Sequence, residues 1–320
     1  MRKTLFIFLM LLVILTCKRL IRSVGKSSDV VVIASQVDED LITENVQLYN
    51  YVPQREGTFT FIFAGDTALN DYKHHHAILL YGSLQDEFIS TMLNTEAYEA
   101  TVQDTFTLFK LENLWAYGQI SMILAVRDPE YIAQGFAKYG QLTSRTLEEH
   151  YYQRVKHNYY DAGISSKMKD HLKKYGLTLD INQAWLIDST HHEDNFIYVH
   201  THFPDRSVFF YKELKRSKLD GPFAIAKRDS LTKRYYNGDY VLKELTRIEP
   251  IEFANLQGVR LKGVWQNDSL IAGGPFLSYF LSDSDTLYVL DGIVFNPGER
   301  KTDYITKIEV ILNSFNLIHP

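Results

Sequence analysis

A single cysteine, Cys17, is present among the 320 residues of this chain. One thiol excludes an internal disulfide framework, and it excludes metal centres built from several thiolates. The fold must therefore be stabilised by an apolar core rather than by covalent cross-links. The composition supplies such a core, because 45% of the residues are hydrophobic and 13% are aromatic. A chain of this length is long enough to bury it.

The position of Cys17 predicts export and anchoring. An apolar run of about 11 residues that ends at Leu15 follows Arg2 and Lys3, and this is the length of a secretory signal core rather than of a membrane span. Cleavage after Thr16 would leave Cys17 as the first residue of a bacterial lipoprotein. We expect Cys17 to be lipidated, with acyl chains such as palmitate holding the protein on a membrane.

The charges that follow Cys17 leave a second interpretation open. Positive charge resists translocation, and four basic residues come after the cleavage point, at Lys18, Arg19, Arg22 and Lys26. An uncleaved membrane anchor with a structural cysteine is therefore the alternative. In the lipoprotein interpretation, residues 17–28 form a basic tether that can lie against anionic lipid.

The remaining chain is expected to have an α+β fold in two domains. We place the signal at 1–16, the tether at 17–28, an N-terminal α+β domain at 29–162 and a C-terminal domain at 163–320. Continuous apolar runs such as Val30–Ile33 predict buried strands in the first domain. Alternating segments predict an antiparallel sheet covered by helices in the second. Helices are also expected over 84–101, 130–139 and 144–160.

Several short runs in the C-terminal half form a recognisable set: Gly263-Val264-Trp265, Gly273-Gly274-Pro275-Phe276-Leu277-Ser278-Tyr279, Leu290–Pro297 and Lys301-Thr302-Asp303-Tyr304. This set resembles an uncharacterised lipoprotein family of Bacteroidetes, a domain of unknown function. The order of strands and helices is also similar to PsbP and Mog1-like sheets, which are binding modules. The resemblance implies a membrane-anchored location and this architecture. It implies no catalytic residues, and fold alone does not fix function.

The run Gly273-Gly274-Pro275-Phe276 is the first candidate binding element. Two glycines let backbone N–H groups approach a ligand or partner closely, and Trp265 and Tyr279 would flank such a loop if their strands pair. The alternative is a tight turn or bulge that leads into a strand. The candidate ligand- or partner-binding residues are thus Trp265, Gly273, Gly274, Pro275, Phe276 and Tyr279.

Histidines are the best candidates for a metal site. His200 and His202 are two residues apart on a predicted strand, so both should point to one side. With His191 and nearby carboxylates they could hold zinc or copper, although a solvated polar strand face is the competing interpretation. The tract His74-His75-His76 is expected to lie at the surface.

These features favour a non-enzymatic binding or assembly module of the cell envelope over an enzyme. The alternative is an envelope hydrolase or metal-binding protein, with His200, His202 and carboxylates in a cleft between the two domains. The net charge of −5 gives no basic footprint for nucleic acid. We expect no cofactor, an outer-membrane position facing the periplasm, and an envelope protein or small ligand as partner.

Overall fold

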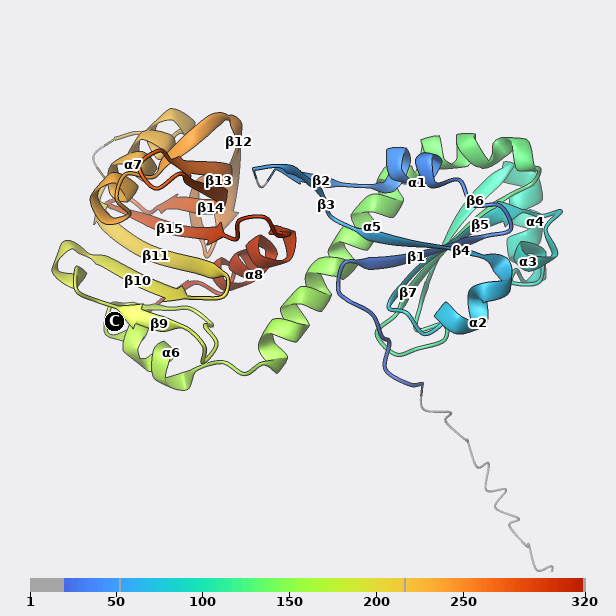
Figure 1. Cartoon of the computed structure of the whole chain (residues 1–320), viewed down its shortest axis with the longest axis horizontal. Helices are drawn as coiled ribbons and strands as arrows, with labels where there is room; N and C mark the ends of the chain where they lie inside the picture. Colours follow the sequence, from blue (N-terminus) through green and yellow to red (C-terminus); the bar gives the residue numbers. More distant parts are fainter. Residues whose placement is uncertain (1–19, 52, 216, 319–320) are drawn as a thin grey trace, which may run out of the picture.

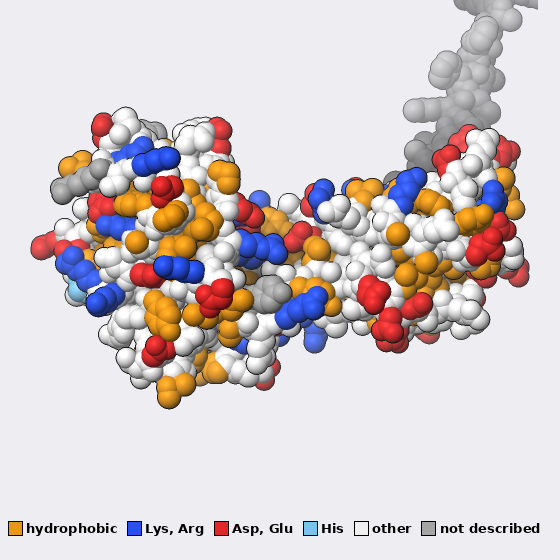
Figure 2. Space-filling model, turned by 90° about the horizontal axis from the view of Figure 1, so that it is seen from above, with side chains coloured by type: hydrophobic (Ala, Val, Ile, Leu, Met, Phe, Trp, Pro, Cys, Tyr) orange, Lys and Arg blue, Asp and Glu red, His pale blue; other side chains and the backbone are white. Residues whose placement is uncertain are grey.

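The computed structural model describes residues 20–318 except 52 and 216, so the predicted lipidation site Cys17 lies outside the described residues. Two lobes lie side by side along the long axis and are joined by helix α5 (Figure 1). Seen from above, a narrower waist separates them, and acidic and basic side chains are interspersed over this face (Figure 2). No helix among the described residues has the length and hydropathy needed to cross a membrane.

A five-stranded, mainly parallel sheet forms the N-terminal lobe. Its strands lie in the order β4 (Thr60–Gly65), β1 (Asp29–Ala34), β5 (Ala77–Ser83), β7 (Ile120–Val126) and β6 (Phe106–Glu112), and only β6 is antiparallel to its neighbour. The central strands are buried on both faces, as expected of a parallel sheet. The helices that accompany the sheet are α1 (Glu39–Val46), α2 (Leu69–Tyr72), α3 (Glu87–Ser90), α4 (Thr95–Asp104) and α5 (Ile132–Asp161).

The three helices expected in this lobe differ from those in the structure. The segment 84–101 contains two helices, because Asn94 caps α4 by accepting a hydrogen bond from the Ala97 N–H and so starts a new helix. Conversely, the helices expected at 130–139 and 144–160 form the single helix α5, since no breaker stands at 141–143. Gly140 lies inside α5, where a Cβ would come within 2.6 Å of the Asn45 carbonyl oxygen. This glycine therefore marks the close packing of α5 on α1.

The C-terminal lobe is built on a seven-stranded antiparallel sheet, which confirms the expected α+β class and the sheet type. The strand order is β12 (Tyr240–Phe253), β13 (Leu256–Asn267), β14 (Ala272–Ser282), β15 (Thr286–Phe295), β11 (Asp205–Leu214), β10 (Phe196–Thr201) and β9 (Leu186–Asp188). Helix α7 (Gly221–Tyr235) covers one face and α8 (Thr302–Leu312) the other, while α6 (Ser166–Lys173) precedes the sheet. Two short pairs complete the fold, β2 (Tyr49–Tyr51) with β3 (Arg55–Gly57) and β8 (Leu177–Thr178) with β16 (Asn316–Leu317).

One apolar cluster continues from the N-terminal sheet through α5 to the α8 face of the large sheet. The Tyr151 hydroxyl on α5 donates a hydrogen bond to Asp303 at 2.8 Å, which ties α5 to α8. The hairpin β2–β3 makes a second link, because the Glu56 carboxylate accepts hydrogen bonds from the backbone N–H groups of Lys301 and Thr302. A separate cluster lies between α7 and the opposite sheet face. The two faces of the large sheet thus have different roles, one joining the lobes and the other remaining within the C-terminal lobe.

Candidate functional site

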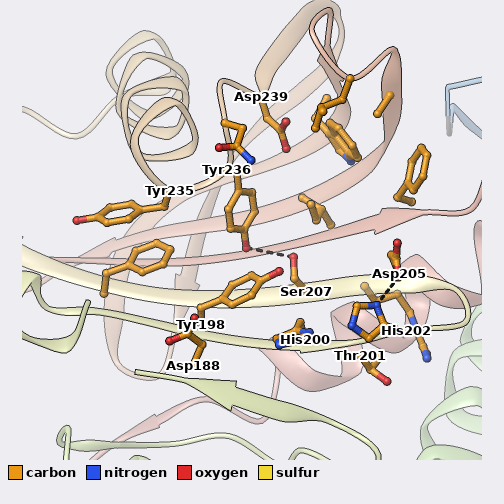
Figure 3. Close-up of a pocket in the computed structure, with 18 of the residues that line it drawn as sticks. Asp188, Tyr198, His200, Thr201, His202, Asp205, Ser207, Tyr235, Tyr236 and Asp239 are labelled. Atoms are coloured by element: carbon orange, nitrogen blue, oxygen red, sulfur yellow. Dashed lines mark hydrogen bonds and ion pairs between the residues drawn. The ribbon is translucent and has the colours of Figure 1, made fainter. Parts of the chain in front are cut away.

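A cavity of about 500 Å³ lies on the α7 face of the large sheet, and residues of the C-terminal lobe alone line it (Figure 3). We call it the aromatic cavity. Its floor comes from β10 and β11, and its walls come from the end of α7 and the β13–β14 hairpin. Six aromatic side chains line it: Phe196, Tyr198, Tyr235, Tyr236, Trp265 and Phe295. A volume of this size is typical of small-molecule sites.

Strand alternation brings the floor residues to one face. Tyr198 and His200 are two apart on β10, and their rings stack with centroids 5.2 Å apart. His200 pairs in register with Ser207 on β11. Helix α7 ends directly above, where Asn237 and Gly238 adopt positive φ values of 56° and 98°. This turn stops the helix and directs the chain back across the sheet.

The tyrosine pair at the end of α7 forms one wall. Tyr235 stacks on Phe196 with ring centroids 3.9 Å apart, and the Tyr236 hydroxyl lies 3.1 Å from the Ser207 hydroxyl (Figure 3). Burial raises the pKa of Tyr236 well above its ordinary value. The phenol therefore stays protonated and fixes Ser207 through a neutral hydrogen bond.

Three carboxylates make the aromatic cavity acidic. These carboxylates are Asp188, Asp205 and Asp239. Arg206 is the one arginine among the lining residues, and its guanidinium lies over the ring of Trp185. Trp185 belongs to the apolar cluster on the other face of the sheet. Burial raises the pKa of Asp239, while Asn267 donates a hydrogen bond to it at 2.8 Å. Hydrogen bonds from Thr190 lower the pKa of Asp188. The cavity therefore favours neutral or cationic ligands that carry hydrogen-bond donors.

The two candidate histidines both line this cavity, on the same side as strand alternation requires. His202 Nδ1 lies 2.7 Å from Asp205 Oδ1, and the rings of His200 and His202 meet edge-on with centroids 5.3 Å apart. The described residues contain no group of three or more His, Cys, Asp or Glu that could hold a metal ion. The expectation that these histidines face a cleft between the domains was wrong, because the whole cavity belongs to the C-terminal lobe.

The glycine-rich run is part of a strand and not a ligand-facing loop. Gly273 and Gly274 pair in unbroken register with Gln266 and Trp265 inside β14, so they form neither a ligand-facing loop nor the turn or bulge of the alternative. Only Trp265 of the six candidate binding residues lines the aromatic cavity. Two others, Pro275 and Phe276, line a cavity of about 420 Å³ between the lobes that also includes residues of β2 and β3. Tyr279 is buried on the α8 face.

Replacing Gly274 with alanine is expected to destabilise the C-terminal lobe by about 2 kcal/mol or more. An added Cβ would lie 2.0 Å from the backbone oxygen of Val294, so strands β14 and β15 would have to separate. Thermal unfolding monitored by circular dichroism measures the loss. The matched control is Gly65→Ala, where a Cβ meets nothing within 4 Å. Equal melting temperatures for the two variants would contradict this prediction.

The tract His74-His75-His76 does not lie at the surface as a whole, because His74 and His75 are half-buried and His76 is buried. His76 is 1% exposed because the segment that enters the N-terminal sheet crosses over it, and the Val24 carbonyl accepts a hydrogen bond from the His76 N–H. The ring of His76 stacks on that of His150 from α5. Asp291 and Glu309 lie on opposite faces of the large sheet. Asp291 binds Arg228 of α7, whereas Glu309 of α8 lies 3.5 Å from Arg260 of β13.

Sequence reasoning missed most of the aromatic cavity. Tyr198 and Asp188 stand within ordinary strand patterns and give no local signal. The run Tyr235-Tyr236-Asn237-Gly238-Asp239 does give one. This run places two tyrosines at the end of a helix, and turn residues and a carboxylate follow them. Binding residues are common in the loops that follow helices.

Comparison with known proteins identifies one family match. Residues 165–314 match the family described as "Domain of unknown function (DUF4837)", which confirms the expected match of the C-terminal half to an uncharacterised family. Among curated proteins, none matches this chain.

Three solved structures show similarity over 45% of this chain. A Bacteroides thetaiotaomicron protein is 8% identical, with a TM-score of 0.29. PsbP from Synechocystis is 10% identical, with a TM-score of 0.32. LpqN of Mycobacterium tuberculosis, described as involved in cell envelope biogenesis, is 10% identical, with a TM-score of 0.29. The matched regions cover 46%, 88% and 83% of those chains, respectively. This chain thus spans about half of the Bacteroides protein.

Proposed function

We propose that this chain, whose residues 165–314 match DUF4837, is a lipid-anchored binding module of the bacterial envelope. The aromatic cavity of about 500 Å³ is the single observation that carries the binding role. The basic and apolar signal pattern before Cys17 supports the proposed anchoring. On this proposal, Cys17 is acylated, the protein is non-enzymatic, and it faces the periplasm from the outer membrane, where an envelope component occupies the cavity.

The cavity chemistry defines the class of ligand. Rings such as Tyr198 and Trp265 offer flat apolar surfaces, and Asp188, Asp205 and Asp239 accept hydrogen bonds. A sugar ring or an amine-bearing side chain presents both an apolar face and several donors. An anionic ligand would lie beside these three carboxylates, and bringing like charges together away from water is costly. Neutral sugars and amino sugars therefore fit this site better than acidic ones.

Ligand-observed NMR with the full-length protein tests this role. Glucosamine and N-acetylglucosamine oligomers should give saturation transfer, and a uronic-acid oligomer of the same length should not. Asp188→Asn should weaken binding about tenfold, which corresponds to about 1.4 kcal/mol. Asp285→Asn, an exposed change in the turn before β15, is the matched control. Equal signals from all three oligomers, or no effect of Asp188→Asn, would refute the proposed ligand class.

A divalent metal held by only two protein ligands, His200 and His202, with solvent or a bound molecule in the other positions, is the second candidate. The favouring observation is that both rings line one cavity and that Asp205 orients His202. Zinc titration by calorimetry should then give one site that His200→Gln removes. The absence of heat in the wild-type protein would eliminate this candidate while leaving the sugar-binding test unaffected.

A further inference from the structure

A second cavity, of about 580 Å³, lies in the N-terminal lobe beside the point where the described chain begins. We call it the entry cavity. Helix α5 provides one wall with His150 and Arg154, the end of β6 and the following turn provide another, and Arg22 and Ser23 of the entering segment close it. The aromatic cavity involves none of these residues.

Arg154 brings to the entry cavity a positive charge that has no ion-pair partner among the described residues, although Asp29 acts on it from beyond salt-bridge distance. Its guanidinium donates hydrogen bonds to the Ser23 hydroxyl at 3.2 Å and to the Gly25 carbonyl at 3.1 Å, while its Nε is buried without a partner. None of the described carboxylates lies within salt-bridge distance of it. Among the other basic groups, Arg22 and His157 both contact Asp161, and Lys110 pairs with Glu112. Glu149 also lines the cavity. An anion at this site would supply the missing counter-charge.

His150 adds a fixed neutral group to the same wall. The Lys26 carbonyl lies 2.6 Å from His76 Nε2, so this nitrogen carries the proton. His76 Nδ1 therefore accepts, and His150 Nε2, at 3.2 Å, donates to it. Burial, with the nearby charge of Arg154, lowers the pKa of His150 to about 4, so the ring is neutral near pH 7 and the guanidinium groups are the anion-binding elements.

The rim of the entry cavity is apolar and exposed. The side chains of Leu20, Ile21 and Tyr117 are 42%, 54% and 67% exposed. Backbone hydrogen bonds hold them together, since the Tyr117 N–H donates to the Ile21 carbonyl and the Ser23 N–H donates to the Tyr117 carbonyl. An exposed tyrosine with aliphatic neighbours and nearby arginines is typical of a surface that lies in a membrane interface.

Cys17 precedes this cavity closely in the sequence. Arg22 is five positions after Cys17, and a fully extended chain over five residues spans at most about 17 Å. We propose that the entry cavity and its rim bind the headgroup phosphate of an anionic glycerophospholipid in the membrane that receives the acyl chains of Cys17. This inference rests on the proposed lipid anchoring. It places the N-terminal lobe against the membrane, with the C-terminal lobe at the other end of α5 (Figure 1).

Photo-crosslinking in lipid nanodiscs tests the proposal with the acylated mature protein, residues 17–320. One set of discs contains phosphatidylcholine alone, and the other also contains a phosphatidylglycerol with a diazirine on its headgroup. Mass spectrometry should locate adducts in peptides covering residues 20–25 and 110–119. Arg154→Ala should reduce the adduct yield about tenfold, as expected for loss of a charge-assisted contact. Tyr117→Ser, a change at an exposed side chain, provides a second variant that should also reduce it.

The matched control is Arg145→Ala, because Arg145 is an exposed residue nine positions earlier on α5 and so lies on the opposite side of the helix. It should leave the yield unchanged. Wild-type yield in both Arg154→Ala and Tyr117→Ser, or adducts confined to other peptides, would overturn the proposal. Complete displacement of the lipid by millimolar inorganic phosphate would also overturn it, in favour of a free anion. A protein that fails to enter phosphatidylcholine discs at all would refute the anchoring itself, together with this inference.

Discussion

Asp291→Asn is expected to lower the free energy of unfolding by about 3–5 kcal/mol, because it removes one partner of a buried ion pair. Asp291 and Arg228 have 0% exposed side chains, and Arg228 Nε donates to Asp291 Oδ2 at 2.7 Å. Ser278 donates a second hydrogen bond to the same carboxylate, and the guanidinium lies over the ring of Phe276 at 4.0 Å. Arg228 Nη1 already lacks a partner. The neutral amide would leave a buried cation without compensation.

Urea unfolding followed by circular dichroism measures this effect. The control is Asp170→Asn, which breaks an exposed pair with Lys173 at 2.8 Å and should cost less than about 1 kcal/mol. Replacing both buried partners, as in Arg228→Met with Asp291→Leu, should recover most of the lost stability because no charge remains buried. A single Asp291→Asn variant as stable as the wild type would show that the pair does not stabilise the C-terminal lobe.

Acidification is expected to destabilise the N-terminal lobe through His76 and His150. Burial, followed by the charge of Arg154, lowers the pKa of His76 from 6.5 to about 3 and that of His150 to about 4. His75 also lies near His76, and Glu112 and Lys110 lie near His150. The unfolded chain therefore binds more protons than the folded one below about pH 6.5. The contribution of the two neutral histidines to the free energy of unfolding is complete above that pH. It is lost as the pH falls towards their pKa values in the folded protein, with a slope of up to about 1.4 kcal/mol per pH unit for each histidine.

Urea midpoints measured between about pH 7.5 and pH 5 test this dependence, a range chosen because most carboxylates stay ionised there. His76→Gln should flatten the curve, and His202→Gln, a change at an exposed ring, should not. Burial raises the pKa values of Asp239 and Glu148, and these groups change stability in the opposite direction. The difference between variants is therefore the decisive quantity. Parallel curves for the wild type and His76→Gln would contradict the assignment.

The C-terminal sheet could be predicted from the sequence because its strands carry their own signals. The alternation from Phe196 to His202 specifies an antiparallel strand with Tyr198 and His200 on one face, and β10 has that form. The N-terminal strands Val30–Ile33 and Ala77–Tyr81 were also predictable as strands from their apolar runs. Their parallel pairing was not, because pairing depends on which segments meet across helices.

The functional regions were the least predictable, since they depend on contacts between distant segments. Gly273 and Gly274 look like a flexible loop in sequence, yet close strand packing requires small residues there. His76 looks exposed within a histidine tract, and only the crossing segment around Val24 buries it. The aromatic cavity combines residues from 188 to 295, a range over which no local pattern extends.

Metabolic labelling with an alkyne fatty acid, combined with intact mass, is the most direct test of the proposed envelope-anchored role. The wild-type protein should be labelled and should begin at Cys17, and its mass should include the acyl groups. Cys17→Ser should remove the label and retain residues 1–16. A wild-type protein that is unlabelled and still carries those residues would contradict the lipoprotein proposal and would support the uncleaved-anchor alternative.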